Sequence, residues 1–183
     1  MMYYNIGILI IFILYFIYDV NSVIWKNRLL NKLFILGTIC LLGENLLLFI
    51  KFMPSIIINY FNIFFIILAI LFFLLLIYTL FFALPFSNTY VDISSKRKVI
   101  KTGVYSLSRH IGVFWFILMY LCLTLIINNL DFTLFAILAC GLNILYIIFQ
   151  DNYTFMKLFD DYLDYKKSVP FLIPNFKHYN KGV

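Results

Sequence analysis

Five long runs of apolar residues dominate this sequence and restrict the folds that are open to it. Each run reaches or approaches the roughly 20 residues that a helix needs to cross the hydrocarbon of a bilayer. Since 64% of the residues are hydrophobic and only 12% are charged, lipid must be the solvent for much of the surface. We therefore predict an all-α, polytopic membrane protein of about five transmembrane helices. The predicted spans are residues 6–20, 33–50, 56–85, 111–127 and 132–149.

The basic residues give this membrane protein an orientation. Of the 14 lysines and arginines, all except Lys51 lie after the first, third or fifth span. These three segments fall on one side of a five-span chain, and basic loops favour the cytosol. The sequence thus predicts an N-terminus outside the membrane and a C-terminus in the cytosol. The net charge of +6 is explained in this way, so we expect the lipid bilayer as a partner and no nucleic acid.

The chain length argues for one domain over residues 1–183. Residues 1–98 hold the first three spans, and residues 99–174 hold most of the polar sequence together with the fourth and fifth spans. Cys40, Cys122 and Cys140 all lie inside apolar runs and far apart in sequence, so we expect small buried side chains and no metal site.

The segment after the fifth span is amphipathic. Over residues 151–167, aromatic and aliphatic side chains recur at helical spacing, and charged side chains fall on the other face. This pattern predicts a helix that continues from the fifth span or lies at the membrane interface. The helix should end at the prolines Pro170 and Pro174, because proline cannot continue a helix. An interfacial helix without a catalytic role is an equally acceptable interpretation of this segment.

Two polar clusters should lie close together at the cytosolic face. Arg109 and His110 precede the fourth span, and Gln150 and Asp151 follow the fifth. A short outer loop makes these two spans an antiparallel hairpin, so the clusters converge. Arg109 is able to hold an anion and His110 to bind a cofactor group or move a proton. Each cluster taken alone also fits a topology signal or a helix cap.

Polar residues also occur within the first two spans. Glu44 lies inside the second span, where a carboxylate is costly and is a functional candidate by default, although it is also explained as a protonated side chain paired between helices. Asp19 lies near the end of the first span, where we expect it to be more easily solvated.

Two motifs carry a family resemblance. Residues 99–110 read V-I-K-T-G-V-Y-S-L-S-R-H, which resembles L-V-x-x-G-P-Y-x-x-x-R-H-P. Residues 162–174 read Y-L-D-Y-K-K-S-V-P-F-L-I-P, which resembles Y-x-x-Y-x-x-x-V-P-x-x-I-P. Both motifs are typical of isoprenylcysteine carboxyl methyltransferases and the related phospholipid methyltransferases, which are integral membrane enzymes. The chain departs from the family pattern in three respects: Val104 and Ile111 replace prolines, Gln150 and Asp151 replace a pair of glutamates, and Leu158-Phe159 replaces Phe-Gly.

The resemblance implies a cytosolic site for S-adenosylmethionine between the inner ends of the fourth and fifth spans and the tail. The methyl acceptor implied is lipidic and enters sideways from the bilayer. Arg109 is the implied catalytic group for a carboxylate acceptor, and Asp151 is the implied base for an amine acceptor. The implied cofactor-binding residues are Tyr105, His110, Gln150, Tyr162 and Tyr165.

Two alternatives remain open. The substituted prolines and glutamates also fit a catalytically inactive relative or an accessory membrane protein that keeps the fold. Glu44 and Asn45 also fit a small membrane transporter, which would require a polar path through the bilayer.

Overall fold

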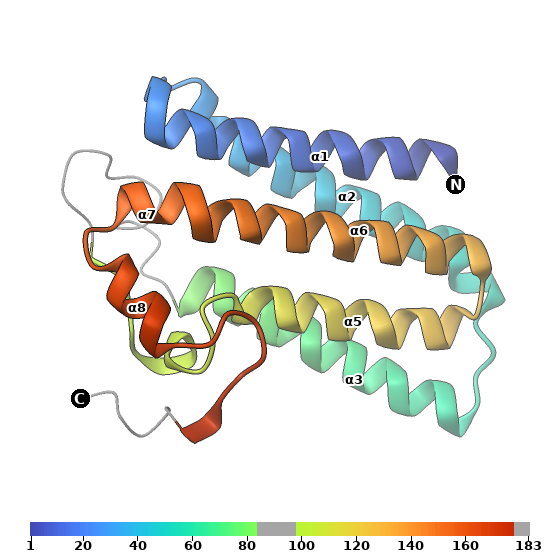
Figure 1. The fold of residues 1–183 in the computed structure, drawn as a ribbon. Coiled ribbons are helices and arrows are strands. Elements are labelled where there is room, and N and C mark those ends of the chain that lie inside the picture. Colours follow the sequence, from blue (N-terminus) through green and yellow to red (C-terminus); the bar gives the residue numbers. More distant parts are fainter. Residues whose placement is uncertain (84–97, 178–183) are drawn as a thin grey trace.

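The computed structural model describes residues 1–83 and 98–177 and contains only helices and loops over these residues (Figure 1). The predicted all-α fold class is therefore confirmed for this part of the chain. Its helices are α1 (Met2–Val20), α2 (Leu33–Phe52), α3 (Tyr60–Ile77), α5 (Ile111–Ile127), α6 (Leu130–Phe149), α7 (Phe155–Leu158) and α8 (Tyr162–Ser168).

Four helical segments are long and apolar enough to cross a membrane. Short irregular turns extend α1, α2, α3 and α6, and the extended segments run over Met2–Trp25, Leu30–Ser55, Tyr60–Phe82 and Leu130–Leu158. The fifth apolar helix, α5, has 17 residues, which at 1.5 Å per residue is roughly 26 Å. Four spans fit a multi-pass membrane protein, and the count of five stays a prediction.

The helix of the third span begins later than the sequence predicted. The apolar run begins at residue 56, but the helix begins at Tyr60. Asn59 is its N-cap, and the Asn59 side-chain oxygen accepts a hydrogen bond from the backbone N–H of Asn62 at 2.8 Å. This cap satisfies a backbone donor that the first helical turn leaves free. The predicted end of this span, at residue 85, lies outside the described residues.

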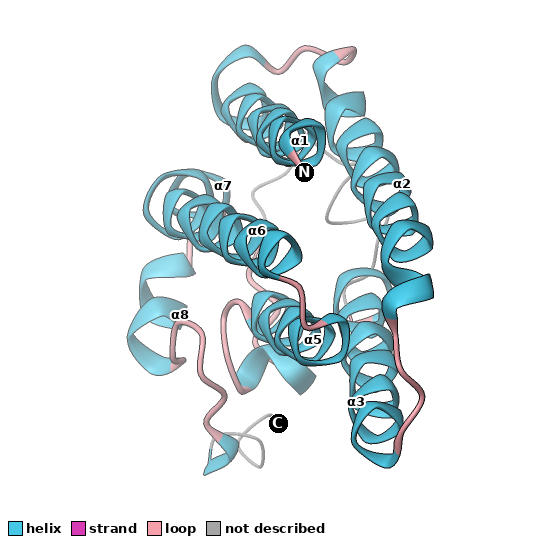
Figure 2. Ribbon diagram, turned by 90° about the vertical axis from the view of Figure 1, so that its right-hand side faces the viewer, coloured by secondary structure: helices cyan, strands magenta, loops and turns pink. Residues whose placement is uncertain are grey.

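The five long helices surround a large cavity. α2 packs on α1, α1 on α6, α6 on α5, and α5 on α3, as the view along the bundle shows (Figure 2). The cavity has a volume of about 1140 Å³, and all five helices contribute to its walls. We use "tail end" for the end of the bundle where α1 and α6 finish, α5 begins and α8 lies (Figure 1).

The two polar residues of the second span lie on different surfaces of α2. Asn45 faces the cavity, and its side-chain oxygen accepts a hydrogen bond from the buried hydroxyl of Tyr120 at 2.6 Å. Glu44 is buried between helices and packs against Gly7 of α1. Glu44 is thus part of the α1–α2 contact and does not line the cavity.

The amphipathic tail is not one continuous helix. A π-helical turn, Gln150–Thr154, extends α6 and leads into the short α7. The chain then becomes extended at Phe159, with φ −122° and ψ 121°, before α8 begins. The helical pattern predicted over residues 151–167 is therefore wrong at Phe159. The break reverses the direction of the chain and lets α8 pack against the turn before α5 (Figure 1).

Candidate functional site

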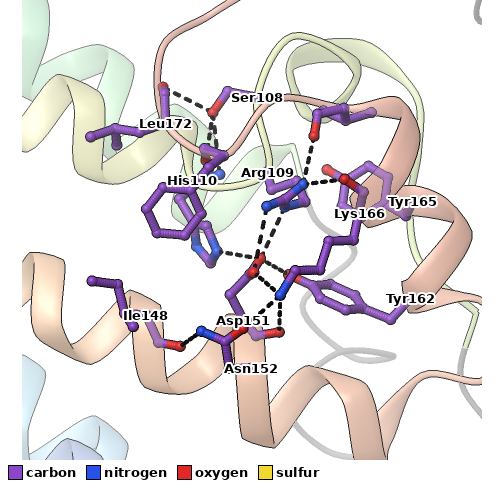
Figure 3. A network of polar contacts seen from close by, with 12 residues as sticks. Ser108, Arg109, His110, Ile148, Asp151, Asn152, Tyr162, Tyr165, Lys166 and Leu172 are labelled. Atoms are coloured by element: carbon purple, nitrogen blue, oxygen red, sulfur yellow. Dashed lines mark hydrogen bonds and ion pairs between the residues drawn. The ribbon is translucent and has the colours of Figure 1, made fainter.

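The carboxylate of Asp151 is the centre of a buried polar network at the tail end (Figure 3). Its Oδ1 accepts hydrogen bonds from Arg109 Nε at 2.9 Å and from the Tyr162 hydroxyl at 2.6 Å. Lys166 Nζ lies 2.7 Å from Oδ2, and His110 Nε2 lies 3.3 Å from Oδ1. The Asp151 side chain is only 3% exposed. Four neighbouring donors stabilise the anionic form, which makes this carboxylate a weak base.

Arg109 joins this network to the end of α8. Its Nη1 donates hydrogen bonds to the backbone oxygens of Lys166 at 2.6 Å and Val169 at 2.7 Å. The last carbonyls of a helix have no partner within the helix, and a cation there also interacts favourably with the helix dipole. Arg109 therefore caps α8 while it neutralises Asp151, and most of its donors are occupied.

The chain after α8 is held against the turn before α5. The backbone N–H of Arg109 donates to the oxygen of Pro170 at 2.9 Å, and that of His110 donates to the oxygen of Phe171 at 3.1 Å. The hydroxyl of Ser108, which is fully buried, donates to the oxygens of Phe171 and Leu172. The two motifs, about 60 residues apart in sequence, thus form one structural unit.

His110 is enclosed by aromatic rings. The Phe155 ring stacks on it at 6.0 Å between centroids, and the Phe171 ring meets it edge-on at 5.0 Å. The side chain is 5% exposed. Burial lowers the pKa of His110, and it outweighs the opposing influence of Asp151. The imidazole is therefore neutral at pH 7 and can donate one proton to a hydrogen bond.

We expect His110 to stay neutral down to a pH below its ordinary pKa of 6.5. Side-chain ¹⁵N NMR in lipid nanodiscs checks this, and His178→Ala leaves His110 as the only histidine. The unfolded chain binds this proton near pH 6.5 while the folded chain does not. Folding stability is therefore expected to fall as the pH drops below 6.5. Protonation of His110 at or above pH 6.5 would contradict the buried environment.

The predicted tyrosines connect the tail to the bundle. Burial, followed by the hydrogen bond to Asp151, raises the pKa of Tyr162, so its phenol remains a donor. The Tyr165 hydroxyl donates to the backbone oxygen of Tyr105 at 2.6 Å. The Tyr105 hydroxyl in turn donates to the backbone oxygen of Thr79 in the last turn of the third span at 2.6 Å. This chain of contacts links α8, the turn before α5 and the third span.

Gln150 and Asp151, which sequence reasoning treated as a pair, face different surroundings. Asp151 turns toward Arg109 and α8. Gln150 Nε2 donates to the Tyr146 hydroxyl at 2.9 Å and faces Asp19 of α1. Asp19 is 2% exposed, so the expectation that it is easily solvated is wrong. Tertiary contacts between α1 and α6 enclose it, and no local sequence signal indicates this.

The cavity described above is lined by residues from both places, the Asp151 network and the neighbourhood of Gln150. Six of the seven predicted site residues line it: Tyr105, Arg109, His110, Gln150, Tyr162 and Tyr165. Asp151 lies behind this wall. Sequence reasoning missed Asp19, Thr79 and Lys166, each of which contacts a predicted residue. Lys166 carries a usable signal, because it follows Tyr162 by four positions on the helix that holds both tyrosines.

Comparisons with known proteins identify no relative. No family model matches the chain, no curated protein matches it, and no solved structure matches it.

Proposed function

We propose that this chain is an integral membrane methyltransferase that uses S-adenosylmethionine and acts on a lipidic acceptor at the cytosolic face. One observation carries the proposal. Five residues from two distant sequence motifs, together with Gln150, line a single cavity at one end of the bundle. The hairpin of α5 and α6 brings Arg109, His110 and Gln150 to this end, but it does not by itself place Tyr162 and Tyr165 on the same wall. The family resemblance of the two motifs supplies the chemistry.

The cavity suits a cofactor of this kind. Its volume of about 1140 Å³ slightly exceeds the range of about 300–1,000 Å³ that is common for ligand pockets, which leaves space for a cofactor and part of an acceptor. The rings of Tyr105, Phe155 and Phe159 on its walls offer faces for a planar base or a sulfonium. When bound, S-adenosylmethionine supplies an activated methyl group. The protein's part is to orient both ligands and to exclude water.

Within this proposal, Arg109 and Asp151 act as positioning residues. Arg109 is occupied by Asp151 and by two carbonyls of the tail, which leaves little capacity to hold an acceptor's carboxylate. Asp151 is turned away from the cavity and accepts from four groups. Their joint role is to fix the tail against α5, so that Tyr105, His110 and Tyr162 keep their places on the cavity wall.

A lipidic acceptor has an apolar route into the cavity. Leu42 and Leu46 of α2 and Ile70 and Phe73 of α3 line the cavity and are exposed as well. Exposed apolar side chains on membrane helices face lipid, so an acyl chain can lie against this wall. This arrangement supports entry from the bilayer.

The membrane topology belongs to the same proposal. α5 is apolar and packs between α3 and α6, both of which are long enough to span. We therefore count α5 as the fifth span, with the N-terminus outside and the tail end at the cytosol. The alternative of a small transporter loses the stronger part of its motivation, because Glu44 packs on Gly7 and only Asn45 faces the cavity. An inactive or accessory relative remains the competing function.

Binding of S-adenosylmethionine by the purified protein in lipid nanodiscs tests the proposal. We expect saturable binding of radiolabelled cofactor that is weakened about tenfold or more by His110→Ala and by Gln150→Ala, since each loses a polar contact. Gln150 lies outside the Asp151 network, so its variant leaves the docking of the tail intact.

Asp164→Asn, at an exposed aspartate of α8, is the control and should bind as the wild type does. Absence of binding at millimolar cofactor would overturn the methyltransferase proposal in favour of an accessory protein. Binding that neither cavity variant changes would place the cofactor elsewhere.

A further inference from the structure

A second polar position lies on the opposite wall of the cavity, at Asp19 near the end of α1. Asp19 lines the cavity and is 2% exposed. The side chains of Tyr146 in α6 and of Gln150 and Thr154 in the turn after it interact with its carboxyl group. None of these four residues takes part in the Asp151 network, so Asp19 is the centre of a separate site.

This site is incompletely satisfied. Oδ2 of Asp19 and Oγ1 of the neighbouring Thr154 are buried, and neither has a hydrogen-bond partner of acceptable geometry among the described residues. Buried polar atoms normally find a partner, and an orphaned one calls for an explanation such as a bound ligand. The ion pairs found between described residues involve Asp151, Asp161 and Asp164, and none of them involves Asp19.

An aromatic cluster on the same cavity adjoins Asp19 through Tyr146. Tyr15 and Tyr146 are stacked at 5.6 Å, and Phe12 meets both rings edge-on at 5.8 and 6.1 Å. Tyr18 and Phe34 extend the same wall, and all five rings line the cavity. A carboxylate beside aromatic faces is the arrangement that recognises organic cations, through charge pairing and cation–π attraction.

We propose that Asp19 and this aromatic wall bind the ammonium group of an amphiphile whose chain lies in the cavity. The rest of the cavity favours an amphiphile over a small cation, because apolar side chains of α2, α3 and α5 form most of its walls. The ammonium group pairs with the Asp19 carboxylate from the cavity side, and its charge compensates a carboxylate that no described basic residue neutralises. Such a site rejects a neutral or anionic head group.

This binding site goes beyond the proposed methyl transfer and does not depend on it. If the cavity also holds S-adenosylmethionine, the acceptor atom is a nitrogen. That consequence rests on the proposed function, whereas recognition of the ammonium group stands on Asp19 alone.

The test is titration calorimetry of the protein without S-adenosylmethionine in phosphatidylglycerol nanodiscs, whose lipids carry no ammonium group that could compete for the site. The probes are dodecylamine, dodecanol and dodecanoate, which share one chain and differ in head group. Empty nanodiscs give the partition into lipid, and the difference gives binding to the protein. We expect saturable binding of the amine that is about tenfold or more tighter than that of the alcohol, because only the amine forms a hydrogen bond in which both groups are charged.

Asp19→Asn should lower amine affinity by about tenfold or more and leave alcohol affinity unchanged, as expected for loss of the charge alone. Asp164→Asn, at an exposed aspartate of the same end, is the matched control and should bind as the wild type does. Should Asp19→Asn fail to fold, the comparison of head groups on the wild type still decides. Equal affinity for amine and alcohol, or preference for the carboxylate, overturns the proposal. So does an Asp19→Asn variant that weakens S-adenosylmethionine binding but not amine binding.

Discussion

Asp151→Ala is expected to lower the free energy of unfolding by about 3–5 kcal/mol, the range found when one partner of a buried ion pair is removed. Without the carboxylate, the Arg109 guanidinium, whose side chain is 7% exposed, keeps its charge with only carbonyls around it. Tyr162 and His110 lose an acceptor at the same time. Arg109 also caps α8. If its unpaired guanidinium moves toward water, this contact is lost and the tail should detach from α5.

Unfolding in mixed micelles with increasing dodecyl sulfate measures the loss, and limited trypsinolysis at Lys166 and Lys167 reports detachment of the tail. Asp164→Ala, at an exposed aspartate of α8, should change neither. A cycle with Arg109→Met adds a second comparison. The double variant should be less destabilised than the sum of the two single variants, because no unpaired charge remains. Additive losses would show that the two side chains do not act as a pair.

Gly37→Leu is expected to destabilise the bundle by about 1–3 kcal/mol through overpacking. A Cβ at Gly37 would lie 2.9 Å from Cε1 of Tyr15, which is closer than such atoms approach. The ring cannot easily retreat, because Phe34 and Tyr146 contact it and its hydroxyl is hydrogen-bonded to Thr38 at 3.3 Å. The same ring forms part of the cavity wall, so amine binding should weaken together with stability.

Gly43→Leu is the matched control in the same helix. Nothing lies within 4 Å of a Cβ at Gly43, so the larger side chain should be tolerated. It should stabilise α2 by up to about 1 kcal/mol, because leucine is the better helix former. Dodecyl sulfate unfolding compares the two variants. Equal stability of Gly37→Leu and Gly43→Leu would contradict the close approach of α1 and α2.

Part of the cavity wall was predictable from the order in which polar residues and apolar runs follow one another along the chain. Arg109 and His110 precede an apolar run, and Gln150 follows the next one. A short connection between two helices brings their distant ends together. The tyrosines of the tail came from a resemblance of motifs, which no comparison with known proteins tests.

The contacts of each polar side chain in the site were harder to predict from the sequence. Gln150 and Asp151 are neighbours, so a helix directs their side chains to different sides, and only the packing of α1 and α8 decides what each side chain meets. The break at Phe159 has the same origin. Its local pattern favours a continuous helix, but α8 gains its contacts with Asp151 and Tyr105 only after the chain turns.

The sequence by itself determined the five apolar helices, most of their ends and the end of the bundle that carries the polar residues. These features follow from local hydropathy, capping and proline, which act over a few residues. The tertiary structure decided the burial of Asp19, the saturation of Asp151 and the cavity between them. These depend on which donors distant helices supply to a carboxylate, and hydrogen bonds and charges act only over a few ångströms in space.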